Sequence, residues 1–234
     1  MVAMTHGTTS EPRPGIWRYS AAGFLVTIVV MYLTEPYVER LRDGRIARGL
    51  IVSLVLFSGG LAVGERKKLL VWAAVLGTPS IILTWLWHFR PDLVPRELSI
   101  GTALLFVLFV SVRLFRFVLG ARTVDSEVLC AAVATYLMLG LGWTFSYILV
   151  GLADPHAFAW TAGPAYGQAM DGFTAMYYSL TTQATLGYGD IVPVSPTARL
   201  LAMTQAVGGM FYMTILIARL VGVYSSQSGA ADPR

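Results

Sequence analysis

The sequence predicts an all-α integral membrane protein, and two observations carry this prediction. Apolar residues make up 56% of the 234 residues and charged residues only 13%, whereas soluble domains average about a quarter charged residues. The apolar residues are also gathered into runs of membrane length, since a transmembrane helix needs about 20 residues. Six such runs are present, at residues 17–34, 48–64, 69–89, 98–119, 127–151 and 195–224. We therefore expect six transmembrane helices.

Polar or helix-breaking residues separate the first four runs. Glu35-Pro36 is expected to end the first helix, because a residue before proline is biased away from the helical conformation. The basic loop 65–68 separates the second run from the third, and Gly77-Thr78-Pro79 predicts a kink within the third. The polar stretch 120–126 follows the fourth run, so residues 16–126 form a four-helix transmembrane unit.

The last two runs enclose a shorter helix. Residues 152–170 form a loop rich in glycine and proline, and the aromatic segment after it predicts a helix over 171–183 with Asp171 as its N-cap. This helix is too short to cross the membrane and must enter and leave on one side. Ser195-Pro196 then marks the start of the last helix, with serine as N-cap and proline in the first turn.

The hexapeptide at residues 185–190, TLGYGD, follows the short helix directly. It holds no pair of a nucleophile and a base, and no group of metal-ligating side chains. It offers its backbone, because Gly187 and Gly189 can adopt positive φ at little steric cost and so let successive carbonyls point the same way.

Residues 177–193, YYSLTTQATLGYGDIVP, resemble the pore helix, selectivity filter and exit of tetrameric potassium channels. The resemblance extends over residues 127–225, the unit of outer helix, pore loop and inner helix. It departs at Leu186, where the family more often has valine or isoleucine. In this family, stacked rings of backbone carbonyls replace the water shell of the ion.

The resemblance implies a homotetrameric, potassium-selective channel with passive conduction and no cofactor. Its filter would contain the residues Thr185, Leu186, Gly187, Tyr188 and Gly189, with K⁺ bound by the carbonyls of the first four and the Thr185 hydroxyl. It also implies a pore domain at 127–225, with short cytoplasmic tails at 1–15 and 226–234. Because both pore helices end toward the cytoplasm in this family, an even number of spans places the N-terminus there too, in a prokaryotic plasma membrane.

Two further roles follow from the same resemblance. The aromatic residue at Tyr178 is expected to donate a hydrogen bond to the Asp190 carboxylate and so to brace the filter. Gly208-Gly209, midway along the inner helix, lies at a position that resembles the gating hinge of the family, although glycine also serves close helix packing.

The fourth run carries Arg113 and Arg116, which suggests a voltage sensor. Residues 99–111 contain no cation, however, whereas a sensor repeats one every third residue through most of the membrane. The two arginines lie near the cytoplasmic end, where long side chains can reach the interface. We therefore expect anchoring rather than voltage sensing, and the sequence does not indicate which stimulus opens the pore.

Three other functions fit parts of the sequence. Residues 187–190 match the GxGD pattern of intramembrane aspartyl proteases, but these enzymes need a second carboxylate in another membrane helix, and every other aspartate maps to a loop, a boundary or a tail. Pore-loop potassium transporters resemble four fused pore units, whereas this chain has one. A nonselective cation pore of the same architecture often carries an acidic residue where Tyr188 stands. The basic residues are scattered among short loops, which favours membrane anchoring over nucleic-acid binding.

Overall fold

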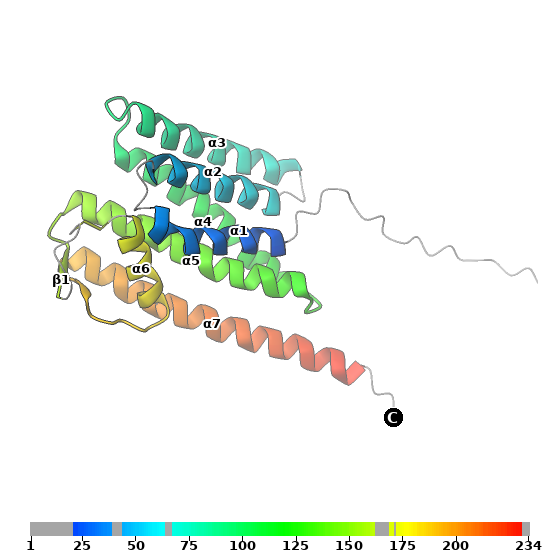
Figure 1. Cartoon of the computed structure of the whole chain (residues 1–234). Helices are drawn as coiled ribbons and strands as arrows, with labels where there is room; N and C mark the ends of the chain where they lie inside the picture. The colour runs from blue at the N-terminus through cyan, green and yellow to red at the C-terminus, as the bar shows by residue number, and fades with distance from the viewer. Residues whose placement is uncertain (1–20, 39–43, 64–66, 162–168, 171, 231–234) are drawn as a thin grey trace, which may run out of the picture.

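The computed structural model describes residues 21–38, 44–63, 67–161, 169–170 and 172–230. Within them the chain forms seven helices and one small antiparallel sheet (Figure 1). In chain order these are α1 Ala21–Val38, α2 Gly44–Val63, α3 Lys67–Phe89, α4 Arg96–Gly120, α5 Ser126–Ala153, β1 Phe158–Trp160, α6 Gly172–Gln183, β2 Ile191–Pro193 and α7 Pro196–Ala230. The all-α prediction is confirmed, apart from two strands of three residues each.

The first four helices pack side by side, and two of them, α1 and α4, also pack against α5 (Figure 1). Their shared core contains Phe24 and Ile28 of α1 together with Phe106, Val107 and Val110 of α4, all of which are fully buried or nearly so. Between helices that lie in lipid, such side chains stabilise the contact by close van der Waals packing. This core attaches the four-helix unit to the outer helix of the same chain.

Helix α6 is short and lies between α5 and α7 at one end of the bundle (Figure 1). The two strands lie at the same end, where β1 pairs with β2 in antiparallel register, Ala159 opposite Val192. Helix α7 has 35 residues and projects past the other helices at the opposite end. The chain between α5 and α7 therefore enters and leaves at one end, as the sequence predicts.

The predicted start of α7 is confirmed, and α5 has an N-cap that the sequence analysis did not predict. Asp125 caps α5, its carboxylate accepting a hydrogen bond from the Val128 amide at 2.9 Å. The Ser195 hydroxyl accepts one from the Ala198 amide at 3.1 Å, and α7 begins at Pro196. The predicted N-cap of the pore helix, Asp171, lies outside the described residues.

Two predicted helix ends are wrong. Helix α1 continues through Glu35-Pro36 to Val38, because a proline in the last turn removes only one backbone hydrogen bond. An ion pair between Glu35 and Arg48 of α2, at 2.7 Å, stabilises this turn. Helix α7 does not end near residue 224 but continues to Ala230.

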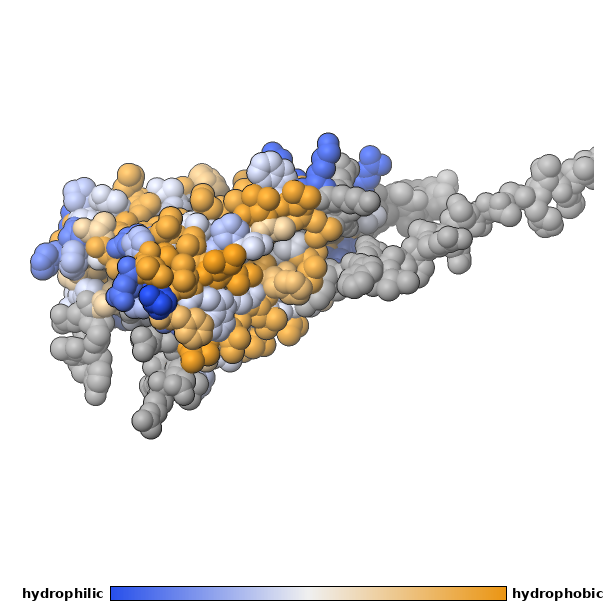
Figure 2. Space-filling model, turned by 90° about the horizontal axis from the view of Figure 1, so that it is seen from above, coloured by the Kyte–Doolittle hydropathy of each residue, from blue (hydrophilic) through white to orange (hydrophobic). Residues whose placement is uncertain are grey.

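Five of the described helices are long and apolar enough to cross a membrane: α1, α3, α4, α5 and α7. The apolar stretch of α2 is shorter, from Ile46 to Ala62. Large apolar side chains are exposed along these helices, among them Leu33, Trp72 and Leu105. Figure 2 shows apolar residues across the middle of one face, with hydrophilic residues toward the ends. Such an apolar band is typical of the surface that a membrane protein exposes to lipid.

Candidate ion pathway

The hexapeptide 185–190 begins two residues after α6 ends at Gln183. Three of its residues, two positions apart, have positive φ: Thr185 at 57°, Gly187 at 50° and Gly189 at 79°. The two glycines adopt the conformation that the sequence predicts for them. Thr185 is a β-branched residue in a region that such residues rarely occupy, at a cost of about 1–3 kcal/mol. Strain of this kind is typical of functional sites.

Two amides of this segment are hydrogen-bonded to α6, whereas four of its carbonyls accept no hydrogen bond within the described residues. The Leu186 and Gly187 amides both donate to the Thr181 carbonyl of α6, at 2.8 and 3.2 Å. Within the described residues, no hydrogen bond reaches the carbonyls of residues 185–188. The segment is also exposed in the single chain, with Leu186 at 56% and Tyr188 at 67%. Its carbonyl oxygens are therefore available to coordinate a cation.

The aromatic brace on Asp190 comes from Tyr177, so the prediction that Tyr178 supplies it is wrong. The Tyr177 hydroxyl donates to Asp190 Oδ2 at 2.8 Å, and its ring stacks on Tyr188 with centroids 6.2 Å apart. Burial and the nearby Asp190 carboxylate raise the pKa of Tyr177 to about 12, so the hydroxyl stays protonated and can donate.

Tyr178 faces a different part of the molecule, since consecutive side chains on a helix point about 100° apart. It is buried at 5% exposure and packs edge-to-face on Tyr147 of α5 and Phe158 of β1, with centroids 4.8 and 5.5 Å away. Sequence reasoning found both the acid and the aromatic pair but chose the wrong member of the pair.

The exit of the hexapeptide is attached to the chain that follows α5. The Thr161 amide donates to the Asp190 carbonyl at 2.8 Å, and the Thr161 hydroxyl donates to the Gly189 carbonyl. The β1–β2 pairing continues this contact from Trp160 to Ile191. Positions 189 and 190 are therefore fixed from two directions, by α6 through Tyr177 and by β1.

A buried polar network lies behind the hexapeptide, and the sequence analysis did not predict it. Gln205 of α7 is fully buried and its amide nitrogen donates to the Ser179 carbonyl at 2.9 Å and hydroxyl at 2.8 Å. Its side-chain oxygen accepts from the Tyr147 hydroxyl at 2.5 Å. The Gln183 amide in turn donates to the Tyr136 carbonyl at 2.7 Å. The sequence does contain a signal for this network, namely a glutamine in each of two apolar helices. A buried side-chain amide needs hydrogen-bond partners, so such a glutamine indicates a polar contact.

Gly208 and Gly209 have different surroundings in the structure. A Cβ atom on Gly209 would lie 2.6 Å from the Gln183 carbonyl oxygen, so only glycine lets α7 approach the end of α6 this closely. A Cβ atom on Gly208 would meet nothing within 4 Å in the single chain. Gly209 thus has a packing role, and the hinge stays a prediction for both.

The arginines near the C-terminal end of α4 differ in exposure. Arg113 is half-buried and its Nε has no hydrogen-bond acceptor among the described residues, whereas Arg116 is exposed. Farther along the chain, Arg219 of α7 donates to the Ala121 carbonyl at 3.0 Å and so joins the inner helix to the chain between α4 and α5.

Residues 127–226, which hold α5, α6, the hexapeptide and most of α7, match the family described as "Ion channel". Residues 127–226 thus carry a domain of the ion channel family. The voltage-gated potassium channel Kch of Escherichia coli K12 is 32% identical to this chain over 160 residues, which cover 68% of this chain and 33% of that protein.

Two further relatives match shorter stretches of the channel. Two pore potassium channel c of Oryza sativa subsp. japonica is 34% identical over 83 residues, covering 36% of this chain and 16% of the relative. The calcium-gated potassium channel TvoK of Thermoplasma volcanium is 38% identical over 55 residues, covering 24% and 16%. The channel thus spans a third or less of the length of these relatives. No solved structure matches it significantly.

The family excludes the aspartyl protease that the GxGD pattern suggested. The family match and the five apolar helices indicate an integral membrane protein with an ion-channel domain and not a protease. Asp190 therefore serves as the acceptor of the Tyr177 hydrogen bond and not as half of a catalytic pair.

Proposed function

We propose that four copies of this chain form a potassium-selective channel, with residues 185–189 as the selectivity filter. One observation carries the proposal: the segment that begins with the strained Thr185 has four successive carbonyls that accept no hydrogen bond within the described residues. The names of the three relatives, all potassium channels, support the choice of ion.

Coordination in this proposal uses the backbone almost alone. The carbonyls of Thr185, Leu186, Gly187 and Tyr188 would form stacked rings around the symmetry axis, with the Thr185 hydroxyl as the innermost ligand. Each K⁺ would exchange its water shell for these oxygens and move downhill between adjacent sites. The C-terminal end of α6 lies directly before Thr185, so the negative end of the helix dipole favours a cation waiting there.

A single chain supplies one quarter of each ring, so closed symmetry requires a homotetramer. The inner helix supports this assembly, because α7 exposes a row of large apolar residues that the chain itself leaves uncovered. Among them are Leu200, Met203, Val207, Met210, Phe211 and Ile217. In the assembly they would line the cavity or contact neighbouring copies.

The membrane topology completes the proposal. Helices α1 to α4, within residues 16–126, and the pore domain 127–225 would contribute six spans, with α2 as the shortest. Both termini, including the tails at 1–15 and 226–234, would then face the cytoplasm, on the side opposite to the filter exit.

Recording from planar bilayers tests the selectivity directly. With purified channel and a tenfold K⁺ gradient, the reversal potential should lie near the potassium equilibrium potential, about 59 mV from zero. Tyr188→Asp should disorder the coordinating layer at this position and admit Na⁺, because it removes the ring that stacks on Tyr177, whereas Tyr37→Phe, exposed at the end of α1, should not. The proposal is falsified if the wild-type reversal potential does not follow the K⁺ gradient.

We also propose that the four-helix unit senses voltage weakly. Arg113 and Arg116 are the cations of α4 between its first turn and its C-terminal end, and both lie toward the inner end. Neutralising the pair to glutamine should reduce yield or membrane orientation more than it alters the voltage dependence of open probability. A steep activation curve that flattens in the double variant would contradict this.

A further inference from the structure

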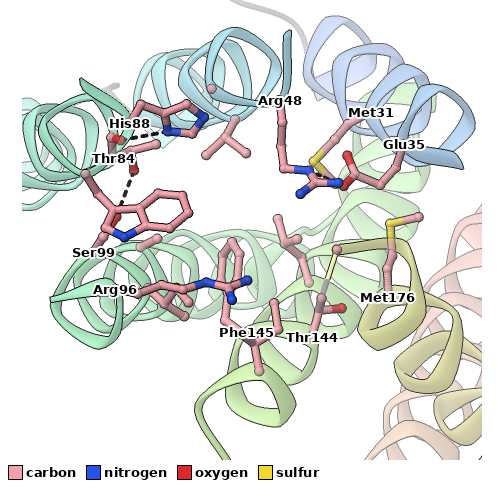
Figure 3. A pocket seen from close by; sticks show the side chains of 18 residues that line it. Met31, Glu35, Arg48, Thr84, His88, Arg96, Ser99, Thr144, Phe145 and Met176 are labelled. Atoms are coloured by element: carbon pink, nitrogen blue, oxygen red, sulfur yellow. Dashed lines mark hydrogen bonds and ion pairs between the residues drawn. The ribbon is translucent and has the colours of Figure 1, made fainter. Parts of the chain in front are cut away.

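A cavity of about 370 Å³ lies where the four-helix unit meets the first turns of α6 (Figure 3). Its walls come from α1, α2, α3, α4, α5 and α6, so it is bounded on one side by the peripheral helices and on the other by the pore domain. It is separate from the ion pathway. A volume of this size falls within the range of small-molecule sites, about 300–1,000 Å³.

Two guanidinium groups point into this cavity from opposite walls, Arg48 from α2 and Arg96 from α4 (Figure 3). Arg48 Nε lies 2.7 Å from the Glu35 carboxylate, but its N–H is not aligned for a hydrogen bond and has no acceptor among the described residues. Arg96 lies over the ring of Trp87, 5.6 Å from its centroid. Among the described lining residues, two guanidinium groups thus face one carboxylate across the cavity.

The remaining lining is mostly apolar. The side chains that form it come chiefly from α1, α5 and α6, and they are Met31, Leu141, Phe145, Ile148 and Met176. A charged patch beside an apolar wall suits a ligand with an anionic head and a hydrocarbon body. The volume is that of a small-molecule site, and we therefore consider a ligand with a single hydrocarbon chain.

We propose that this cavity binds a long-chain carboxylate from the bilayer, with its head between Arg48 and Arg96 and its chain along the apolar wall. The proposed position of the carboxylate head is also close to the start of α6. A Cβ atom on Gly172, the first residue of α6, would lie 2.9 Å from Arg48 Nη2. The cavity therefore reaches the N-terminus of the pore helix, where the helix dipole favours a negative charge. A bound carboxylate would contact the peripheral unit and the pore helix at once.

Binding of tetradecanoate to the full, delipidated protein in detergent tests the proposal, with tetradecanol as the uncharged ligand of equal chain length. We expect saturable binding of one tetradecanoate per chain and at least tenfold weaker binding of the alcohol, since a charge-assisted hydrogen bond changes affinity by about tenfold or more. Arg96→Gln should weaken tetradecanoate binding by about tenfold or more. Arg90→Gln, an exposed arginine outside the cavity, is the matched control and should bind as the wild type does.

A second variant keeps the proposal testable if Arg96→Gln folds poorly. Ile100→Trp enlarges a half-buried lining residue without changing charge, and it should abolish tetradecanoate binding by filling the space. Equal binding of acid and alcohol, equal binding by Arg96→Gln and Arg90→Gln, or unchanged binding by Ile100→Trp would each overturn the proposal. Because the assay measures no ion flow, its failure would leave the proposed channel function untouched.

Discussion

Replacing Gln205 by leucine should disturb the filter from behind without touching it. The side chain is fully buried, and it joins α7 to Ser179 of α6 and to Tyr147 of α5. Leucine has a similar size but offers no hydrogen bonds, so the Tyr147 hydroxyl loses its acceptor and the Ser179 carbonyl loses its donor. An unsatisfied buried polar group costs about 1–3 kcal/mol. With two such groups we expect a loss of roughly 2–6 kcal/mol in stability of the folded chain.

The effect on conduction should be separable from this loss of stability. Gln205 also lies 3.3 Å from the Gln183 side-chain oxygen, and Gln183 is the last residue of α6 before the filter. We therefore expect Gln205→Leu to shorten the open lifetime of single channels while leaving the reversal potential in place.

Thermal unfolding and single-channel recording of the same preparations check both expectations. Thr204→Val, a neighbouring exposed position on α7, is the control because its hydroxyl contacts only the Leu200 carbonyl of its own helix. Tyr147→Phe should cost less, about 1–3 kcal/mol, since one acceptor is left unpaired. Adding it to Gln205→Leu should cost less than the sum of the two, because both remove one shared bond. Full additivity, or a Gln205→Leu variant indistinguishable from Thr204→Val, would refute this reasoning.

Two other predictions rest on pairs of neighbouring residues. Tyr177→Phe should hasten loss of current during sustained opening, because it removes a charge-assisted bond worth about 1.5–3 kcal/mol. Tyr178→Phe keeps its aromatic packing and should leave this time course nearly unchanged. A larger effect of Tyr178→Phe than of Tyr177→Phe would show that the brace is misassigned. Gly209→Ala should lower thermal stability and open probability, because its methyl group would meet the Gln183 carbonyl at 2.6 Å. Gly208→Ala should be tolerated, and an equal effect at both glycines would favour a hinge over close packing.

The sequence predicted most of the helices and the positive φ of the two glycines in the hexapeptide, because these depend on local signals. Apolar length sets the spans, Ser195-Pro196 sets the start of α7, and the two glycines at 187 and 189 allow positive φ. It could not choose between Tyr177 and Tyr178, because that choice depends on how α6 is rotated against β1 and α5. Nor did it find the partners of Gln205, because they come from helices 26 and 58 positions away along the chain.

The contacts of α5 explain how a peripheral unit can influence a filter that it does not touch. Helix α5 packs on α1 and α4 along one side and on α6 and α7 along the other. Its Gly140 carbonyl accepts a hydrogen bond from the Ser179 hydroxyl at 2.7 Å, and the Tyr32 hydroxyl of α1 donates to the neighbouring Leu137 carbonyl at 2.8 Å. These two bonds therefore connect α1 to α6 through less than one turn of α5. Because all three helices belong to one chain, this connection requires no contact between copies.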